Sequence, residues 1–225
     1  DGSNIKPSWV NTLGYLVSIS LDWNLVDWLA ENAPAALVKF ESDRLQPHLR
    51  AKVFKLIFEK YESQGLHFND DLCDEIELAH FANSNEILVY LLDRISNPQH
   101  YVSQYTAVNI LGYFPSLFGK NSNVREILLK CCEQYPATDK TTCRLAMVAL
   151  YQLELQTPDT TRRLMEKFNE VDEDFIRLGM YQYLLGTREQ NAYAEYCLSG
   201  IKLIAYRLNT ETTRIANEEM ALINC

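Results

Sequence analysis

One apolar pattern recurs along this chain in the same register, and it constrains the fold more than any other feature. The copies read RAKVFKLI from Arg50, QYTAVNIL from Gln104, RLAMVALY from Arg144 and RLGMYQYL from Arg177. Each copy opens with a polar residue and places apolar residues three, four and seven positions later, which is the spacing of one helix face. These apolar residues are Val53, Phe54 and Ile57; Ala107, Val108 and Leu111; Met147, Val148 and Tyr151; and Met180, Tyr181 and Leu184.

The copies start 54, 40 and 33 residues apart, and periods in this range are typical of stacked helical hairpins. A single hairpin of this kind cannot bury its own apolar face, so the stack is the folding unit. The sequence therefore predicts an all-α fold, an α-solenoid of HEAT-like antiparallel helical hairpins, with residues 1–225 as a single domain. A kink or a change of repeat type is expected at 114–123, where Gly, Pro, Ser and Asn cluster.

Apolar periodicity and turn residues predict helices throughout and no strand. Three helix starts carry capping signals: Asn97-Pro98 and Thr157-Pro158 each place an N-cap before a proline, and Thr187 with Gln190 has capping-box spacing. The predicted helices are 8–19, 22–32, 34–40, 47–64, 70–82, 84–96, 98–114, 122–135, 139–156, 158–169, 173–186, 188–208 and 211–223.

Composition and charge disfavour several classes of protein. Thirty acidic against twenty-one basic residues give a net charge of −9, and a nucleic-acid-binding domain normally needs a basic stripe. No apolar run approaches the roughly 20 residues that span a bilayer, so no membrane partner is expected. Buried free thiols in a reducing cytoplasm are favoured over disulfides, because free cysteine behaves as a small hydrophobic residue. The six cysteines are Cys73, Cys131, Cys132, Cys143, Cys197 and Cys225.

Motifs of catalysis and cofactor binding are missing from the sequence. The eight glycines form neither a dinucleotide-binding nor a P-loop pattern, and GxSxG, HExxH and CxxC do not occur. His67, Cys73 and His80 have spacings that fit no structural zinc pattern. We therefore expect no catalytic residue, no cofactor and no metal, and a protein that is not an enzyme.

Aromatic residues suggest where a partner protein would bind. In the N-terminal part, core packing between short helices is favoured over a peptide groove; the residues are Trp9, Tyr15, Trp23, Trp28, Phe40, Phe54, Phe58 and Tyr61. Near the C-terminus a group of tyrosines is too dense to be buried together, so some should face solvent or a protein or peptide partner. This candidate contact region consists of Tyr181, Tyr183, Tyr193, Tyr196 and Tyr206.

A segment near the N-terminus resembles the helical region that follows the nucleotide-binding core in bacterial STAND NTPases of the NACHT type. It runs from Trp9 to Ser63, about a quarter of the chain. The matching features are Trp9 with Leu13, the helix of Val26, Trp28 and Leu29 before Ala33-Pro34, then Leu37 and Asp43, and Leu49-Arg50 opening a helix that ends near Tyr61. The resemblance implies a C-terminal sensor or scaffold region of a longer protein, with the ATP-binding core upstream.

Four charged residues occupy matching positions in consecutive repeats. Asp139 precedes Arg144 by five residues, as Asp172 precedes Arg177. The resemblance to HEAT-like proteins implies a ladder between repeats, in which Asp172 couples to Arg144. The alternative is equally compatible with the residues: each Asp caps its own helix, because a carboxylate accepts hydrogen bonds from the first backbone N–H groups, and each Arg points into water.

These observations favour a non-catalytic protein-interaction or sensor module of a larger signalling or defence NTPase, located in the cytoplasm. One alternative is a constitutive assembly scaffold built from helical repeats. A further alternative is a HEAT-like enzyme that processes nucleic acid, which the acidic balance disfavours.

Overall fold

The computed structural model describes all residues except 1–6, 21, 40–44, 66–67, 69–72, 116–121, 170, 188–189 and 224–225, and the side chains beyond Thr210 lie outside that description. The described residues form twelve helices and no strand, which confirms the all-α prediction. They divide into two compact units, residues 1–155 and 156–225. The change of repeat type expected at 114–123 falls partly outside the described residues, whereas the division between units follows Leu155.

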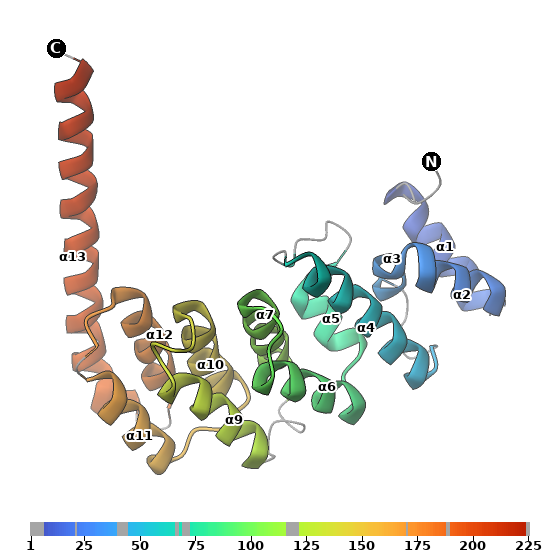
Figure 1. Ribbon diagram of the computed structural model, residues 1–225, viewed down its shortest axis with the longest axis horizontal. Coiled ribbons are helices and arrows are strands. Elements are labelled where there is room, and N and C mark those ends of the chain that lie inside the picture. Colours follow the sequence, from blue (N-terminus) through green and yellow to red (C-terminus); the bar gives the residue numbers. More distant parts are fainter. Residues whose placement is uncertain are drawn as a thin grey trace. The chain divides into compact units, whose positions relative to one another are not determined.

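Unit 1 consists of short helices that follow one another closely (Figure 1). They are α1 (Pro7–Ser20), α2 (Trp23–Asn32), α3 (Pro34–Val38), α4 (Pro47–Gln64), α5 (Glu75–Phe81), α6 (Asn85–Ser96), α7 (Tyr101–Gly112), α9 (Ser122–Glu133) and α10 (Lys140–Gln152). Unit 2 contains α11 (Pro158–Phe168), α12 (Asp174–Leu185) and the long α13 (Gln190–Ile223).

Two neighbouring hairpins form the centre of unit 1. Helix α6 packs on α7, and α9 packs on α10; the hairpins are then joined by contacts of α7 with α10 and of α6 with α9. The approach of α7 to α10 is close at Gly112, where a Cβ atom would lie 2.5 Å from Oε1 of Gln152 and 3.4 Å from Cβ of Ala149. A Cβ atom at this position would require the Gln152 side chain to move aside, so glycine suits the close contact.

Ten of the twelve apolar residues in the repeated pattern are buried. Val53, Phe54 and Ile57 on α4 are buried, and so are the predicted residues of α7 and α12. The exceptions lie on α10, where Val148 is only partly buried and Tyr151 is 43% exposed. The buried face of α10 is rotated toward Cys143, Ala146, Met147, Ala149 and Leu150, since this helix is covered by both α7 and α9.

Of the three capping predictions, the one at Thr157 is confirmed and the one at Asn97-Pro98 is wrong. Thr157 caps α11 as predicted, and its Oγ1 accepts a hydrogen bond from the Thr160 N–H at 3.1 Å. Asn97 instead ends α6, and α7 begins three residues after Pro98, where His100 N–H donates to Ser103 Oγ. Thr187 Oγ1 donates to the Leu184 carbonyl at 2.8 Å at the end of α12. Its capping role toward Gln190 stays a prediction, because residues 188–189 lie outside the described part of the chain.

Helix α13 also corrects the prediction of two helices, 188–208 and 211–223. It runs unbroken for 34 residues, and Figure 1 shows it extending well beyond α12. The predicted break at Asn209-Thr210 contains neither glycine nor proline. Thr210 Oγ1 donates to the Tyr206 carbonyl at 2.9 Å, one turn back, so the threonine satisfies its hydroxyl within the helix.

Candidate functional site

The five tyrosines predicted as a contact region occupy two different environments in unit 2. Tyr181 and Tyr183, on α12, are 6% and 0% exposed and so belong to the core. Tyr193 on α13 is partly buried, whereas Tyr196 and Tyr206 on the same helix are 44% and 70% exposed. Of these five tyrosines, Tyr196 and Tyr206 are the exposed ones, and Tyr206 is the one exposed by more than half.

The buried tyrosines hold the three helices of unit 2 together. The Tyr183 hydroxyl lies 3.0 Å from Oγ1 of Thr161 on α11, and Gln156 Nε2 donates to the Tyr183 carbonyl at 3.1 Å. Tyr181 packs edge-on against Tyr196 with ring centroids 5.7 Å apart and planes at 79°. Burial raises the pKa of Tyr181, so its hydroxyl stays protonated near neutral pH.

Gly200 allows α13 to lie against the Tyr181 ring. A Cβ atom at position 200 would be 2.0 Å from Oη and 2.2 Å from Cζ of Tyr181. We expect Gly200→Ala to lower the free energy of unfolding by about 1–3 kcal/mol, because overpacking displaces a buried ring. Urea denaturation measures this loss. Ser199→Ala, one residue earlier on the exposed side, is the matched control; equal losses in both variants would exclude the close contact as the cause.

An exposed apolar face runs along the first half of α13. Tyr196, Leu203 and Tyr206 are separated by seven and three residues, which places them on one side of the helix. They are 44%, 47% and 70% exposed. Cys197 and Ile204, one residue further on, lie on the adjacent side and are buried. We call Tyr196, Leu203 and Tyr206 the α13 face.

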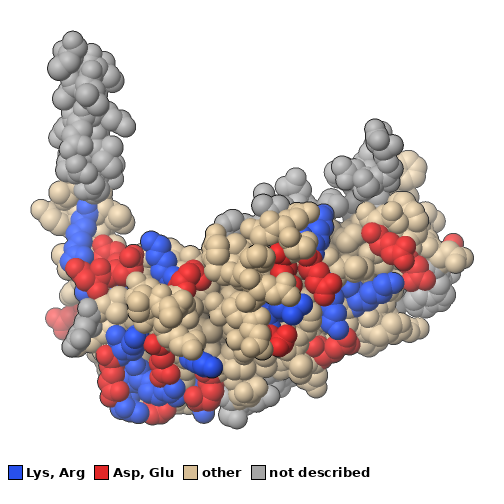
Figure 2. Space-filling view, viewed as in Figure 1, with Lys and Arg blue, Asp and Glu red and all other residues tan. Residues whose placement is uncertain are grey.

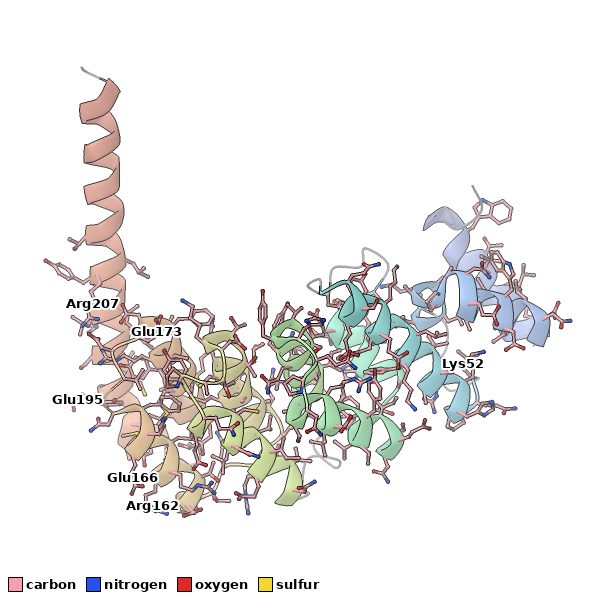
Figure 3. All side chains as sticks on the ribbon, viewed as in Figure 1. Lys52, Arg162, Glu166, Glu173, Glu195 and Arg207 are labelled. Atoms are coloured by element: carbon pink, nitrogen blue, oxygen red, sulfur yellow. The ribbon has the colours of Figure 1, made fainter. Side chains whose placement is uncertain are left out.

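Charged residues border this face on α13 and at the start of α12. Arg207 Nη1 is 3.3 Å from Oδ1 of Asp172 and 3.1 Å from Oδ1 of Asp174. Asp172 Oδ1 also lies 3.2 Å from Arg177 Nη1. In Figure 3, Glu195 and Arg207 project from α13, and Glu173 lies by the start of α12. The α13 face therefore has a charged border, as protein interfaces often do.

The residues of the predicted ladder have local partners in the structure. Asp139 caps α10, because its Oδ1 accepts from the Thr141 and Thr142 N–H groups at 2.8 and 3.1 Å. Asp172 pairs with Arg177 of its own repeat, and Arg177 Nε donates to the Val171 carbonyl at 2.8 Å. Arg144 is partly buried on α10. The coupling of Asp172 to Arg144 across the repeats stays a prediction.

A second exposed apolar surface lies at the beginning of unit 1. Helix α1 has the sequence PSWVNTLGYLVSIS and contains no charged residue. Trp9 and Ile19 are 57% and 62% exposed, and Trp28 on α2 is 45% exposed. The prediction that these N-terminal aromatic residues form core is thus wrong for Trp9, Tyr15 and Trp28, although it is right for Phe54 and Phe58 of α4. The Trp23 side chain and Phe40 lie outside the described residues.

The cysteines are free thiols wherever the structure describes them. Cys73, Cys131, Cys132, Cys143 and Cys197 are all buried, and Cys225 lies outside the described part. Burial raises the pKa of the Cys131 thiol to about 12 and that of Cys132 well above its ordinary value. Neutral thiols are poor nucleophiles, so these side chains act as core residues.

The described residues provide neither a metal-binding cluster nor a membrane-spanning helix. They contain no group of three or more His, Cys, Asp or Glu side chains that could bind a metal ion. His80 is exposed on α5, and His67 lies outside this part of the chain. No described helix is both long and apolar enough to cross a bilayer. On the face shown in Figure 2, acidic and basic side chains are intermixed over α11, where Arg162 pairs with Asp159 and Glu166.

Comparison with known proteins gives no relative: no protein family matches the sequence, and neither the curated proteins nor the solved structures provide a significant match.

Proposed function

We propose that this chain is a non-catalytic protein-interaction module, the helical sensor or scaffold region of a larger cytoplasmic NTPase, and that it is built as a HEAT-like solenoid. The stacking of the α6–α7 hairpin on the α9–α10 hairpin supports the solenoid, because like helices of consecutive hairpins are in contact. The resemblance of residues 9–63 to NACHT-type proteins supports the link to an upstream ATP-binding core.

The observation that carries the proposal is the chemistry of the first and last helices. Here α1 and α2 expose Trp9, Ile19 and Trp28, and α13 exposes Leu203 and Tyr206. Large exposed aromatic and aliphatic groups with a polar border mark protein contacts. Elsewhere in the described chain such residues occur singly, as at Val89 of α6.

We expect the double substitution Leu203→Glu and Tyr206→Glu to weaken assembly of the full-length protein from the same gene by more than about tenfold, because carboxylates would be buried in the contact. Sedimentation velocity over a concentration series, with and without ATP, measures assembly. Val89→Glu is the matched control, since Val89 is 67% exposed and belongs to α6, outside α1, α2 and α13.

Three outcomes separate the candidate functions. A loss confined to the α13 variant, in a protein whose assembly depends on ATP, supports the sensor. The same loss in a protein without an upstream nucleotide-binding core supports the constitutive scaffold. Assembly that is insensitive to the α13 substitutions, or ATP hydrolysis by residues 1–225 alone, contradicts the proposal.

A further inference from the structure

A groove of about 270 Å³ lies in unit 1 between the two central hairpins. One wall is the end of α6 with the following turn, the other is α9 with the turn after it, and Gln104 of α7 contributes from the side. The volume corresponds to about nine water molecules at roughly 30 Å³ each, so the groove is too large for one structural water. It approaches the lower end of small-ligand pockets, about 300 Å³.

Part of the groove lining is apolar. Ile95, Ile127 and Cys131 contribute from α6 and α9, with Pro98 at the rim. Ile95 and Cys131 are almost fully buried. An aliphatic side chain can therefore be buried here.

The polar part of the lining matches a polypeptide backbone. Gln104 Nε2 donates to the Ile95 carbonyl at 2.8 Å, which orients the amide and leaves its Oε1 as an acceptor. The exposed side chain of Gln134 makes no hydrogen bond to a described residue, so it offers both a donor and an acceptor. The Thr138 side chain completes this side of the groove.

Lys130 gives the groove its charge preference. Among the described residues of the lining it is the one ionised side chain, and it forms no ion pair within the described part of the chain. Glu126, one turn earlier on α9, lies 3.6 Å from Arg125 Nε instead. A lysine without an acidic partner favours a carboxylate ligand, and this local attraction acts against the repulsion from a chain of net charge −9.

We infer that this groove binds an extended peptide segment that presents a carboxylate to Lys130. The peptide backbone meets the amides of Gln104 and Gln134, and an aliphatic side chain rests on Ile95 and Ile127. The groove shares no residue with the α13 face. The proposal of peptide binding and the proposal of assembly are therefore tested separately. Either proposal can be refuted while the other one holds.

Nuclear magnetic resonance titration of the ¹⁵N-labelled chain tests this site with three probes. They are acetyl-Leu-Glu-amide, its uncharged isostere acetyl-Leu-Gln-amide, and propionate, which offers the carboxylate without a peptide. We expect the Glu peptide to shift amide signals of residues 95–104 and 127–138, and to bind about three- to fivefold more tightly than the Gln peptide. Propionate should bind more weakly than both.

Lys130→Gln should abolish the preference for the Glu peptide over the Gln peptide. The matched control is Lys52→Gln on α4, an exposed lysine in Figure 3 that is far from the groove in sequence. Circular dichroism checks that both variants stay helical. Equal effects of the two substitutions, propionate binding as tightly as the peptide, or no shifts at these residues would each overturn the inference.

Discussion

Replacement of Arg94 by methionine should destabilise unit 1 by about 3–5 kcal/mol, because it leaves a buried carboxylate without its cation. The Glu62 side chain on α4 is 5% exposed, and its Oε2 lies 3.1 Å from Nε of Arg94, which is 19% exposed. Glu62 Oε1 has no hydrogen bond to a described residue. Arg94 also covers the Tyr90 ring, 4.8 Å from its centroid.

Urea denaturation of the intact chain measures this effect, with Lys55→Met as the matched control. Lys55 pairs with Glu86 at 2.6 Å between the same two helices, but the side chains are 34% and 54% exposed. Such an exposed pair contributes about 0–1 kcal/mol. The double variant Glu62→Leu and Arg94→Met should recover much of the loss, since no charge stays buried. A loss from Arg94→Met no larger than the control value would refute the argument.

Local sequence signals predicted helices well where they include both ends. Helix α4 was predicted at 47–64 with both ends correct: Pro47 begins it, and Gly65 ends it at a φ of 60°, a conformation that glycine adopts without strain. Helix α7 was predicted too early, because the Pro98 signal was outweighed by the hydrogen bonds between His100 and Ser103. Such competition between nearby caps is decided by geometry that a residue pattern does not contain.

The candidate contact region was predictable in part. The density of tyrosines correctly indicated that some are exposed, but the pattern could not separate Tyr183 from Tyr206. That separation depends on how α13 lies on α12, which Gly200 and Tyr181 determine at short range. The available signal was Gly200, because a glycine within a helical apolar pattern often marks a close approach between two helices.

Long-range contacts were beyond the sequence argument altogether. Glu62 and Arg94 are 32 positions apart and meet only because α4 packs on α6. The groove likewise joins Gln104 of α7 to Lys130 of α9, on two hairpins whose register no local motif specifies. From the sequence alone, both Glu62 and Arg94 would be expected to lie in solvent.

The adjacent thiols of α9 should make the protein unusually sensitive to alkaline pH. Burial, together with the nearby Cys143, raises the pKa of Cys131 from 9.0 to about 12 and that of Cys132 well above 9.0. Because both pKa values are higher in the folded state, the folded chain retains protons that the unfolded chain loses. Their contribution to stability is complete below about pH 9 and is lost as the pH rises toward 12.

Each thiol should lower the free energy of unfolding by about 1.4 kcal/mol per pH unit in that range. Urea denaturation between pH 8 and 11 therefore compares the wild-type chain with the double variant Cys131→Ala and Cys132→Ala. The variant is expected to be less stable at pH 8, because buried groups are lost, but to have a shallower decline above pH 9. Other groups that titrate in alkali, such as Tyr90, are present in both proteins and cancel in the comparison. Parallel pH profiles would show that these thiols are not held neutral by the fold.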